Sequence, residues 1–428
     1  MNNLLLPLSA YLILTENCNL RCKYCFERNS RTVTQYMPED TALKVVDTLF
    51  DNVQKLIDAG TNPNGLRVGI TFFGGEPCLC PDLMQTVVEY GVNKSKETGI
   101  NINFSIITNG TIYNDKLEAF MERWVELTDG NINIQLSIDG TPDIQDANRP
   151  CAISTQKSSE LIEANVVKFK EFFKTHNIDA MKLQLHAVIS KASLPKLYES
   201  FRYFYETLKL YESKFAWVIE DEWDDEDVEI LDHELGKIVN YLIPITTNIE
   251  RFPLKHFDHC SGCSAGKQLV CVDTEGYIYP CHRFFFFARK NPDLVFGNIN
   301  DPELDIMSSD ARQKFLKFDP NSITDICQIC MATNYEATGT LDGRPNDYDV
   351  KFMEVINDWF DIFQKAINEK MTVQMINYLK SKVDYLEAII EYNGLKIPEN
   401  INMNNQKHSC NGNCNGECSC KKDTTENE

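Results

Sequence analysis

Hydrophobic and polar positions alternate regularly along the first 242 residues. Short runs rich in β-branched and aromatic residues alternate with longer runs in which apolar residues recur every three or four positions. The short runs have the length of strands, and the longer runs have the period of amphipathic helices. The predicted strands cover 10–14, 67–73, 103–108, 133–138, 182–189 and 215–219, and the predicted helices cover 38–59, 81–97, 114–127, 156–176 and 194–210. Six strand–helix units in series predict parallel strands joined by right-handed crossovers.

The alternation stops near residue 250, and other patterns follow. Asp273-Thr-Glu-Gly276 is a turn sequence between two apolar β-rich runs, and it predicts a hairpin that draws Cys271 and Cys281 together. The helical period returns over residues 347–392, where one apolar face includes Met353, Ile356, Phe360 and Ile367. We expect helices there that pack on the domain that begins near residue 250 and contains the hairpin.

Three cysteines, Cys18, Cys22 and Cys25, directly follow the first predicted strand. Thiolates are the ligands of iron–sulfur cubes, and three of them can hold three irons of a cube while the fourth iron stays open. An open metal position is typical of catalytic sites. A zinc loop or three unrelated core thiols is the simpler alternative, although zinc motifs usually occur as paired CxxC sequences.

Polar and glycine-rich sequences end the next predicted strands. They are Gly74-Gly75-Glu76-Pro77, Thr108-Asn109-Gly110 and Ser137-Ile138-Asp139-Gly140. Each alone could be an ordinary turn, since Asn-Gly and Asp-Gly are common loop dipeptides. In parallel barrels, however, function gathers at the carboxyl ends of the strands. All three sequences are therefore expected on the face that carries the three cysteines.

The CxxxCxxC spacing, with Tyr24 before its last cysteine and GGEP one strand–helix unit later, resembles the radical S-adenosylmethionine (SAM) enzymes. The resemblance implies an α/β fold built on a partial (β/α)6 TIM-like barrel. It also implies that the open iron of a [4Fe-4S] cluster chelates SAM, which one electron cleaves to a 5′-deoxyadenosyl radical. The implied SAM-binding residues are Tyr24, Gly74, Gly75, Glu76, Pro77, Asn109, Ser137, Asp139 and Arg149, and the implied cluster ligands are Cys18, Cys22 and Cys25.

A second group of cysteines follows residue 250 and includes a CxxC pair and the predicted hairpin, which together indicate a metal region. Its candidate ligands are Cys260, Cys263, Cys271, Cys281, Cys327 and Cys330. Zinc is chemically possible there. The spacing resembles the SPASM domain, the auxiliary iron–sulfur extension of radical SAM enzymes that modify peptides and proteins. Unlike the full pattern, residues 331–341 contain no cysteine, so one or two auxiliary clusters are expected.

The last cysteines, Cys410, Cys414, Cys418 and Cys420, lie in a tail with almost no apolar residues, which cannot form a core. Three of them recur every four residues. The tail could complete an auxiliary cluster, bind metal independently, or imitate a peptide substrate. The third alternative arises because the chain resembles maturases whose target peptides carry CxxxCxxx repeats.

Composition restricts the class of protein further. The net charge of −21 argues against a nucleic-acid partner, which would need clustered Lys and Arg. We expect no secretory signal and no membrane span. Sixteen cysteines without a secretory signal indicate metal ligands in a reducing cytoplasm instead of disulfides. The cytoplasmic location is an expectation.

The sequence thus predicts a radical SAM enzyme that modifies a ribosomally made, Cys-rich peptide and forms thioether crosslinks from Cys sulfur to carbon. Expected partners are the peptide, a separate leader-binding protein, and an electron donor such as flavodoxin or ferredoxin. The expected domains are a barrel over 1–242, a SPASM-like domain over 250–345, C-terminal helices over 346–395 and a flexible tail over 396–428. No catalytic acid or base is identified.

Two alternatives remain open. One is a formylglycine-generating enzyme like the anaerobic sulfatase maturases. Those enzymes carry an Asp base directly after the cysteine equivalent to Cys281, where this chain has His282. The other is a non-enzymatic protein that binds structural zinc or stores iron, which would not explain GGEP in register with CxxxCxxC.

Overall fold

A computed structural model describes residues 5–25, 35–218, 220–254, 263–318, 330–343 and 348–392. By its internal contacts the chain divides into two compact units, Met1–Ile367 and Asn368–Glu428. Cys260, Cys327 and the Cys410–Cys420 tail lie outside the described residues. In the described part, no helix has the length and apolar content needed to cross a membrane.

Six parallel strands form the centre of the first unit, as the sequence predicts. In space they follow one another in chain order, and each is paired with its neighbour. Their bounds are β1 Ser9–Ile13, β2 Arg67–Phe73, β3 Asn101–Thr108, β4 Ile134–Ser137, β5 Leu183–Ile189 and β6 Ser213–Trp217. The bounds of β2 match the prediction, whereas β6 begins two residues earlier than predicted.

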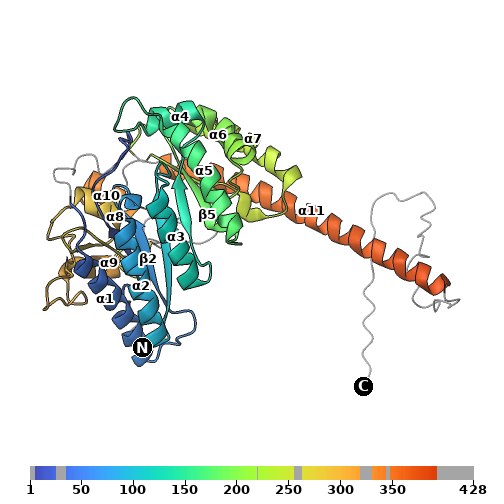
Figure 1. Ribbon diagram of the computed structural model, residues 1–428. Helices are drawn as coiled ribbons and strands as arrows, with labels where there is room; N and C mark the ends of the chain where they lie inside the picture. Colours follow the sequence, from blue (N-terminus) through green and yellow to red (C-terminus); the bar gives the residue numbers. More distant parts are fainter. Residues whose placement is uncertain are drawn as a thin grey trace, which may run out of the picture. The chain divides into compact units, whose positions relative to one another are not determined.

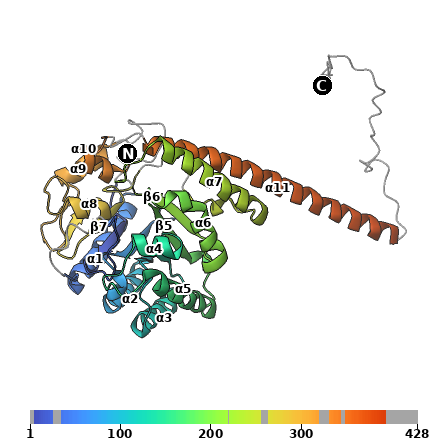
Figure 2. The same ribbon diagram turned by 90° about the horizontal axis from the view of Figure 1, so that it is seen from above.

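Helices cover the outer face of this curved row of strands (Figures 1 and 2). They are α1 Glu39–Asp58, α2 Pro81–Thr98, α3 Asp115–Thr128, α4 Pro142–Asn148, α5 Ser158–Thr175, α6 Leu197–Arg202 and α7 Asp225–Ile245. The helix predicted over 194–210 is in fact a 3-10 turn (Leu194–Lys196), then α6, then a π-helical segment (Tyr203–Leu208). Pro195 explains the irregular start, because proline removes a backbone donor.

The two faces of the sheet differ in polarity, because successive side chains of a strand point to opposite sides. On the outer face, Phe72 and Phe104 are fully buried and contact Trp124 of α3 edge-on, with ring centroids 6.5 and 6.3 Å from the indole. Inner-face residues are only half-buried, and they include Tyr11, Thr71, Ser105, Gln135, Ser137 and His186. The core therefore lies between sheet and helices, and the inner face is polar and partly accessible.

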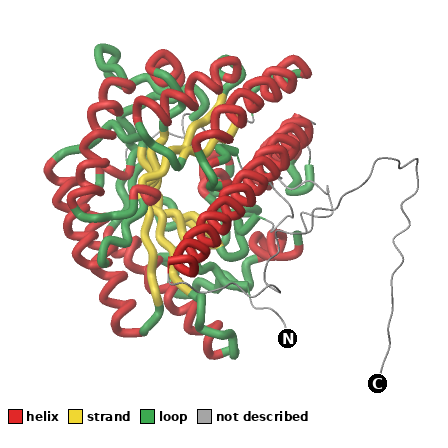
Figure 3. Tube along the Cα trace, turned by 90° about the vertical axis from the view of Figure 1, so that its right-hand side faces the viewer, coloured by secondary structure: helices red, strands yellow, loops and turns green. Residues whose placement is uncertain are grey.

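The predicted hairpin is confirmed, and it extends the same sheet. Its strands are β7 Leu269–Val272 and β8 Tyr277–Tyr279, followed by β9 Gly297–Asn298. β7 pairs in parallel with the free edge of β1, which places Cys271 directly beside Tyr11. Among the described residues, the resulting sheet has nine strands in the order β6-β5-β4-β3-β2-β1-β7-β8-β9. Figure 3 shows the strands in yellow as a curved row, with helices in red along its outer side. Three short helices complete this region: α8 His282–Phe287, α9 Asp310–Lys317 and α10 Met331–Thr338.

The C-terminal helical pattern forms one continuous helix, α11 Tyr348–Tyr392, where several helices were expected. The predicted apolar face is buried as far as Ile367. Phe352 lies against Trp217 and Trp223 with ring centroids 5.5 and 5.0 Å apart. Phe252, at the start of the predicted 250–345 domain, lies 5.4 Å from Phe360 and 5.9 Å from Phe363 by ring centroids. Trp359 donates a hydrogen bond to Asp232 of α7 (2.7 Å). Aromatic packing thus attaches this part of α11 to the last strand and helix of the barrel.

Candidate active site

The three cysteines of the CxxxCxxC loop lie together at the carboxyl end of β1. Cys22 is buried with Leu20 and Cys151, and Cys18 and Cys25 pack against this small cluster. Leu20 forms an antiparallel bridge with Cys151. Backbone hydrogen bonds from Arg21 and Lys23 to the carbonyls of Pro150 and Asn148 (2.7 and 2.9 Å) extend the contact. The loop is therefore held against the segment that follows α4.

Nitrogen donors surround these thiols. The backbone N–H of Leu20 and the Asn109 amide donate to Cys18 Sγ at 3.4 and 3.7 Å, and Arg149 Nη1 lies 4.0 Å from Cys22 Sγ. Donors and a positive charge favour the thiolate, which is the form that binds iron. Within the described ranges no three Cys, His, Asp or Glu side chains have metal-binding geometry. The donor set fits a thiolate-bound cluster in its chemistry, and its ligands remain a prediction.

Tyr24, Asp139 and Arg149, which the sequence predicts as SAM-binding, contact one another. The fully buried carboxylate of Asp139 accepts from Arg149 Nε (2.9 Å), the Tyr24 hydroxyl (2.5 Å) and the backbone N–H of Val188 (3.1 Å). Burial and the neighbouring carboxylate raise the pKa of Tyr24 well above its ordinary value, although Arg149 opposes this. The Arg149 guanidinium also lies over the Tyr24 ring, 5.3 Å from its centroid. This network connects the cysteine loop to the ends of β4 and α4.

Glu76 of the GGEP sequence is fully enclosed by protein groups. One carboxylate oxygen accepts from the Thr108 hydroxyl (2.6 Å) and the Cys78 N–H (3.0 Å), and the other accepts from the Asn109 N–H (2.8 Å). Burial raises the pKa of Glu76, and these hydrogen bonds act in the opposite direction. Glu76 therefore fixes the end of β3 to the end of β2.

The two glycines of GGEP lie against the chain that leads into Cys18. A Cβ on Gly74 would be 2.4 Å from the Thr15 carbonyl oxygen, and one on Gly75 would be 2.2 Å from the Asn17 carbonyl oxygen. Gly75 and Glu76 donate backbone hydrogen bonds to the same two oxygens, both at 2.8 Å. Only glycine permits this approach of two backbones. Pro77 follows as the first residue of a 3-10 turn, Pro77–Leu79.

The remaining two predicted SAM-binding residues lie nearby. The side-chain amide of Asn109 donates to the Asn19 side chain (2.9 Å), and the oxygen of the same amide accepts from the Thr111 hydroxyl (2.6 Å). Ser137 is half-buried at the end of β4, in register with His186 of β5. Asn109 thus connects β3 to the cysteine loop, while Ser137 faces the inner side of the sheet.

Four predicted auxiliary ligands, Cys263, Cys271, Cys281 and Cys330, lie around the first strand. Burial and the charges of Cys281, Cys271 and Cys263 raise the pKa of Tyr11 to about 12. Burial and the charge of Cys330, with a smaller effect of Cys263, raise the pKa of Cys281 to about 12. Electrostatic influence of this kind requires proximity. These cysteines therefore share one neighbourhood beside β1.

An aromatic group that the sequence analysis missed lies between the two cysteine regions. The His282 ring is 4.6 Å from the Tyr11 ring and 4.9 Å from the Phe73 ring. Burial lowers the pKa of His282 to about 3, and the charges of Arg283 and His186 contribute. The imidazole is therefore neutral at ordinary pH. The signal that could have found Tyr11 and Phe73 is the period-two inner face of β1 and β2.

An ion pair that the sequence analysis also missed joins the hairpin region to the cysteine loop. Arg289 Nη1 and Nη2 donate to both carboxylate oxygens of Glu16 at 2.9 and 2.6 Å. Glu16 is two residues before Cys18. No local pattern predicts this pair, because its partners lie 273 positions apart in the sequence.

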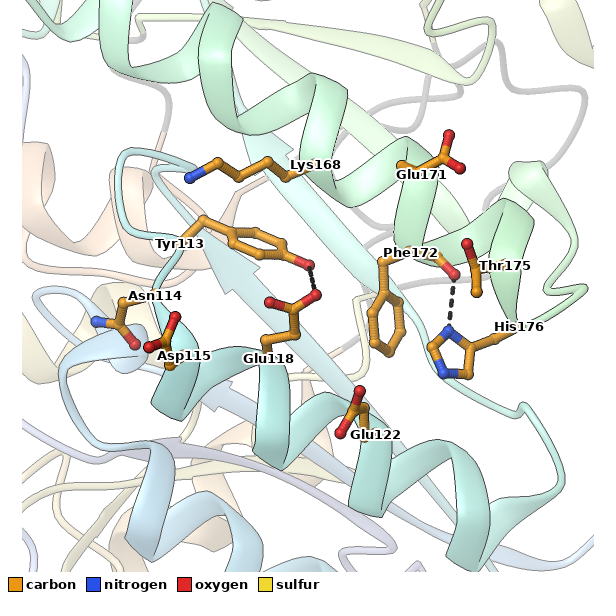
Figure 4. Close-up of a pocket in the computed structure, with 10 residues that line it drawn as sticks. All are labelled: Tyr113, Asn114, Asp115, Glu118, Glu122, Lys168, Glu171, Phe172, Thr175 and His176. Atoms are coloured by element: carbon orange, nitrogen blue, oxygen red, sulfur yellow. Dashed lines mark hydrogen bonds between the residues drawn. The ribbon is translucent and has the colours of Figure 1, made fainter.

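A pocket of about 330 Å³ lies on the outer side of the sheet, between α3 and α5 (Figure 4). Its lining includes Tyr113, which donates to Glu118 (3.2 Å), and also Lys168 and His176. None of the predicted site residues lines it. The chemistry of the inner face is therefore separate from this pocket.

Two family models match the chain. The radical SAM superfamily matches residues 12–184, and the SPASM iron–sulfur cluster-binding domain matches residues 263–331. The two matches cover both cysteine regions.

Curated relatives are similar at low identity. The radical SAM cyclopropyl synthase TigE of Paramaledivibacter caminithermalis is 23% identical over 305 residues, which are 68% of this chain and 59% of that protein. The tungsten-containing aldehyde ferredoxin oxidoreductase cofactor-modifying protein of Pyrococcus furiosus is 26% identical over 75% of this chain and 86% of its own length. A cysteine-type anaerobic sulfatase-maturating enzyme of Clostridium novyi is 29% identical over 32% of this chain and 33% of its own length.

Solved structures share the fold. Native anSMEcpe with bound AdoMet (SAM) has a TM-score of 0.63 at 19% identity and covers 85% of this chain and all of its own. Streptococcus suis SuiB bound to S-adenosylmethionine has a TM-score of 0.50 at 15% identity, over 79% of this chain and 76% of its own. These likenesses confirm the predicted partial barrel with an added cysteine-rich domain.

Proposed function

This chain is a radical SAM enzyme with a SPASM domain, and on that basis we propose that it modifies a ribosomally made, Cys-rich peptide by joining a Cys sulfur to a carbon atom. The radical SAM domain uses a [4Fe-4S] cluster with SAM, and the SPASM domain holds auxiliary iron–sulfur chemistry. When bound, the cluster and SAM supply a carbon radical strong enough to remove a hydrogen atom from a C–H bond.

One observation carries the proposal. β7 is paired with β1, so Cys271 lies beside Tyr11 on the sheet whose carboxyl end leads to Cys18. Both cysteine regions therefore border the same polar, half-buried inner face. Such a face suits a substrate whose C–H bond is attacked at one end while its thiol is held at the other. Metal coordination would deprotonate that thiol.

The fold is compatible with a peptide substrate. A solved structure of native anSMEcpe holds both AdoMet and the Cp18Cys peptide, and it has a TM-score of 0.63 with this chain at 18% identity. That complex concerns another protein, but it supports a peptide on the inner face here. The strongly acidic chain also suits a neutral or basic segment.

In the proposed reaction the substrate is oxidised by two electrons. The substrate carbon loses a hydrogen atom to the 5′-carbon derived from SAM, and the substrate thiol loses a proton. A carbon–sulfur bond forms, and auxiliary iron held by the second cysteine group would take up the surplus electron. The substrate loses two hydrogens per crosslink. A ferredoxin- or flavodoxin-type donor supplies the electron that cleaves SAM, and methionine and 5′-deoxyadenosine leave.

The residues of this chain bind and orient in that scheme. We assign the SAM cluster to Cys18, Cys22 and Cys25, and auxiliary iron to the second cysteine group. We assign Asn109 and Ser137 to SAM contacts. Because Tyr24 and Arg149 already bind both oxygens of Asp139, we propose that Asp139 orients these two side chains toward SAM. Gly74, Gly75, Glu76 and Pro77 fix the backbone beside SAM.

A formylglycine-generating reaction is the second candidate, favoured by the similarity to the sulfatase-maturating enzyme. Sulfatase maturases carry an Asp base at the position that His282 occupies in this chain, and this difference counts against the second candidate. His282 is held between Tyr11 and Phe73, and burial keeps its imidazole neutral. The two reactions give different products from a Cys-containing peptide: a crosslink retains sulfur, whereas formylglycine made from Cys loses it.

The test is anaerobic turnover of the reconstituted enzyme with a synthetic peptide carrying CxxxCxxx repeats. We expect SAM-dependent loss of two hydrogens per crosslink and resistance of the modified Cys to thiol alkylation. The Cys18→Ala variant is the control and should form neither 5′-deoxyadenosine nor product. Loss of sulfur from the peptide would instead support the formylglycine reaction.

A further inference from the structure

The segment between β1 and Cys18 is held on two sides. On one side, the backbones of Gly75 and Glu76 donate to the carbonyl oxygens of Thr15 and Asn17 at 2.8 Å. Side chains are excluded there, because a Cβ on Gly75 would reach the Asn17 carbonyl. Both contacts come from the barrel itself.

The SPASM domain forms the other side. Arg289, which follows α8, makes the bidentate pair with Glu16, whose side chain is only 4% exposed, while that of Arg289 is 23% exposed. Thr274 of the β7–β8 turn lies 3.4 Å from Glu16 Oε1 and donates to the Gln35 side chain at 3.1 Å. The backbone carbonyl of Gln35 in turn accepts hydrogen bonds from the Thr15 hydroxyl and the Glu16 N–H.

Strand register explains why the SPASM domain reaches this position. Val272 of β7 lies beside Leu12 of β1, so the turn that carries Thr274 is level with the start of the cysteine loop. The Arg289 guanidinium also lies over the Phe285 ring, with its central carbon 5.4 Å from the ring centroid. The pair thus connects the segment after α8 of the SPASM domain to a residue two positions before Cys18.

We infer that Arg289 is a positioning residue of the SPASM domain: through Glu16 it holds the CxxxCxxC loop in the arrangement that binds SAM. The inference depends on the radical SAM chemistry and not on which substrate is modified. It makes SAM binding in the barrel depend on the auxiliary domain without requiring a cluster-to-cluster contact.

Electrostatics distinguishes this role from simple attachment of two domains. Removing Arg289 alone leaves a buried carboxylate without its charge partner, whereas removing both charges eliminates that penalty. Replacing both charged residues by neutral ones should therefore restore most of the SAM affinity that the Arg289 substitution alone loses. Coupling of this kind is measured by a double-mutant cycle.

The experiment uses the full chain, reconstituted anaerobically, with Arg289→Met, Glu16→Gln, the double variant Glu16→Gln/Arg289→Met, and Arg251→Met as a matched control. Arg251 pairs with Glu212 at 2.7 Å with side chains 19% and 12% exposed, and it lies by β6, away from the cysteine loop. The readouts are EPR of the reduced protein with and without SAM, KM for SAM and kcat for 5′-deoxyadenosine, and hydrogen exchange of residues 14–25.

We expect Arg289→Met to keep its iron content, to raise KM for SAM by roughly tenfold or more, and to weaken the EPR change that SAM causes. Exchange of the loop amides should accelerate. The double variant should recover to within about threefold of the parent, and Arg251→Met should behave like the parent. If Arg289→Met and Arg251→Met affect KM and loop exchange equally, or if Arg289→Met changes only thermal stability, the inference is wrong.

Discussion

Glu76 shows how a single buried carboxylate can organise a site. Its carboxylate accepts hydrogen bonds from Thr108 and Asn109 at the end of β3, and from Cys78 in the 3-10 turn that directly follows Glu76. The sequence predicts a polar residue here and, through the resemblance, a contact to SAM. It cannot predict that the protein's own donors occupy both oxygens, because two of the three donors, Thr108 and Asn109, lie some thirty positions away.

Glu76 should leave a pH signature on stability. Its folded-state pKa is raised above 4.5, chiefly by burial, so the folded state binds more protons than the unfolded state between the two values. Stability therefore falls as pH rises from about 4.5 through the folded-state pKa. The Glu76→Gln variant lacks this dependence. We expect the difference in unfolding free energy between variant and parent to shift in favour of the variant with rising pH.

Denaturant unfolding of the two apo-proteins at several pH values measures this difference. Gln also replaces one acceptor oxygen by a donor, which costs about 1 kcal/mol at every pH. That constant offset is separable from the slope. A difference that stays flat across the range would contradict the raised pKa.

The approach of GGEP to the β1 loop gives a second test, now between two elements. Gly75→Ala would bring a Cβ within 2.2 Å of a backbone oxygen, so one of the two segments must move. We expect a loss of about 2 kcal/mol or more in stability and incomplete loading of the SAM cluster, measured by iron and sulfide counting. Gly130→Ala is the control, because it meets nothing closer than 3.9 Å. Its positive φ should cost only about 1 kcal/mol, with the iron content unchanged.

The contact between α11 and α7 also depends on a single glycine. Gly236 of α7 lies under the Trp359 ring, and a Cβ there would be 2.8 Å from it. Gly236→Leu should overpack this contact at a cost of about 1–3 kcal/mol. Limited proteolysis should then cut the first half of α11 faster than in the parent. The control is His233→Leu, at an exposed position of the same helix, which should leave the cleavage rate unchanged.

Elements of this fold differ in how far their local sequence determines them. The strands and helices of the barrel follow from periodicity, because each buries one face on a neighbour in the chain. The pairing of β7 with β1 does not follow, since it joins residues about 260 positions apart through backbone groups that every strand has. The partners of α11 could not be read from its sequence for a related reason: its apolar face indicates burial but does not name the partners, which include Trp217, Trp223, Phe252 and α7.

At the scale of the whole molecule, the proposed reaction divides its chemistry between the two cysteine regions. Cys18 follows β1, and Cys271 lies beside β1 on β7. The first region would hold the cluster that cleaves SAM, and the second would hold the iron that binds the substrate sulfur and takes up the surplus electron. Removing one predicted ligand from each region should therefore produce two different defects, although β1, which leads to Cys18, and β7, which carries Cys271, are paired in one sheet.

Cys18→Ala should abolish formation of 5′-deoxyadenosine, with or without peptide. Cys271→Ser should retain SAM cleavage within about tenfold, because the three loop cysteines remain, but the peptide should leave without a crosslink. The measurement is 5′-deoxyadenosine and peptide mass from the same anaerobic reaction, with iron counted for each protein. Crosslinking at the parent's rate by Cys271→Ser would remove the auxiliary region from the reaction. Loss of SAM cleavage in Cys271→Ser, despite a loaded first cluster, would mean that β7 acts on β1 through the shared sheet, so that the two regions work as one structural unit.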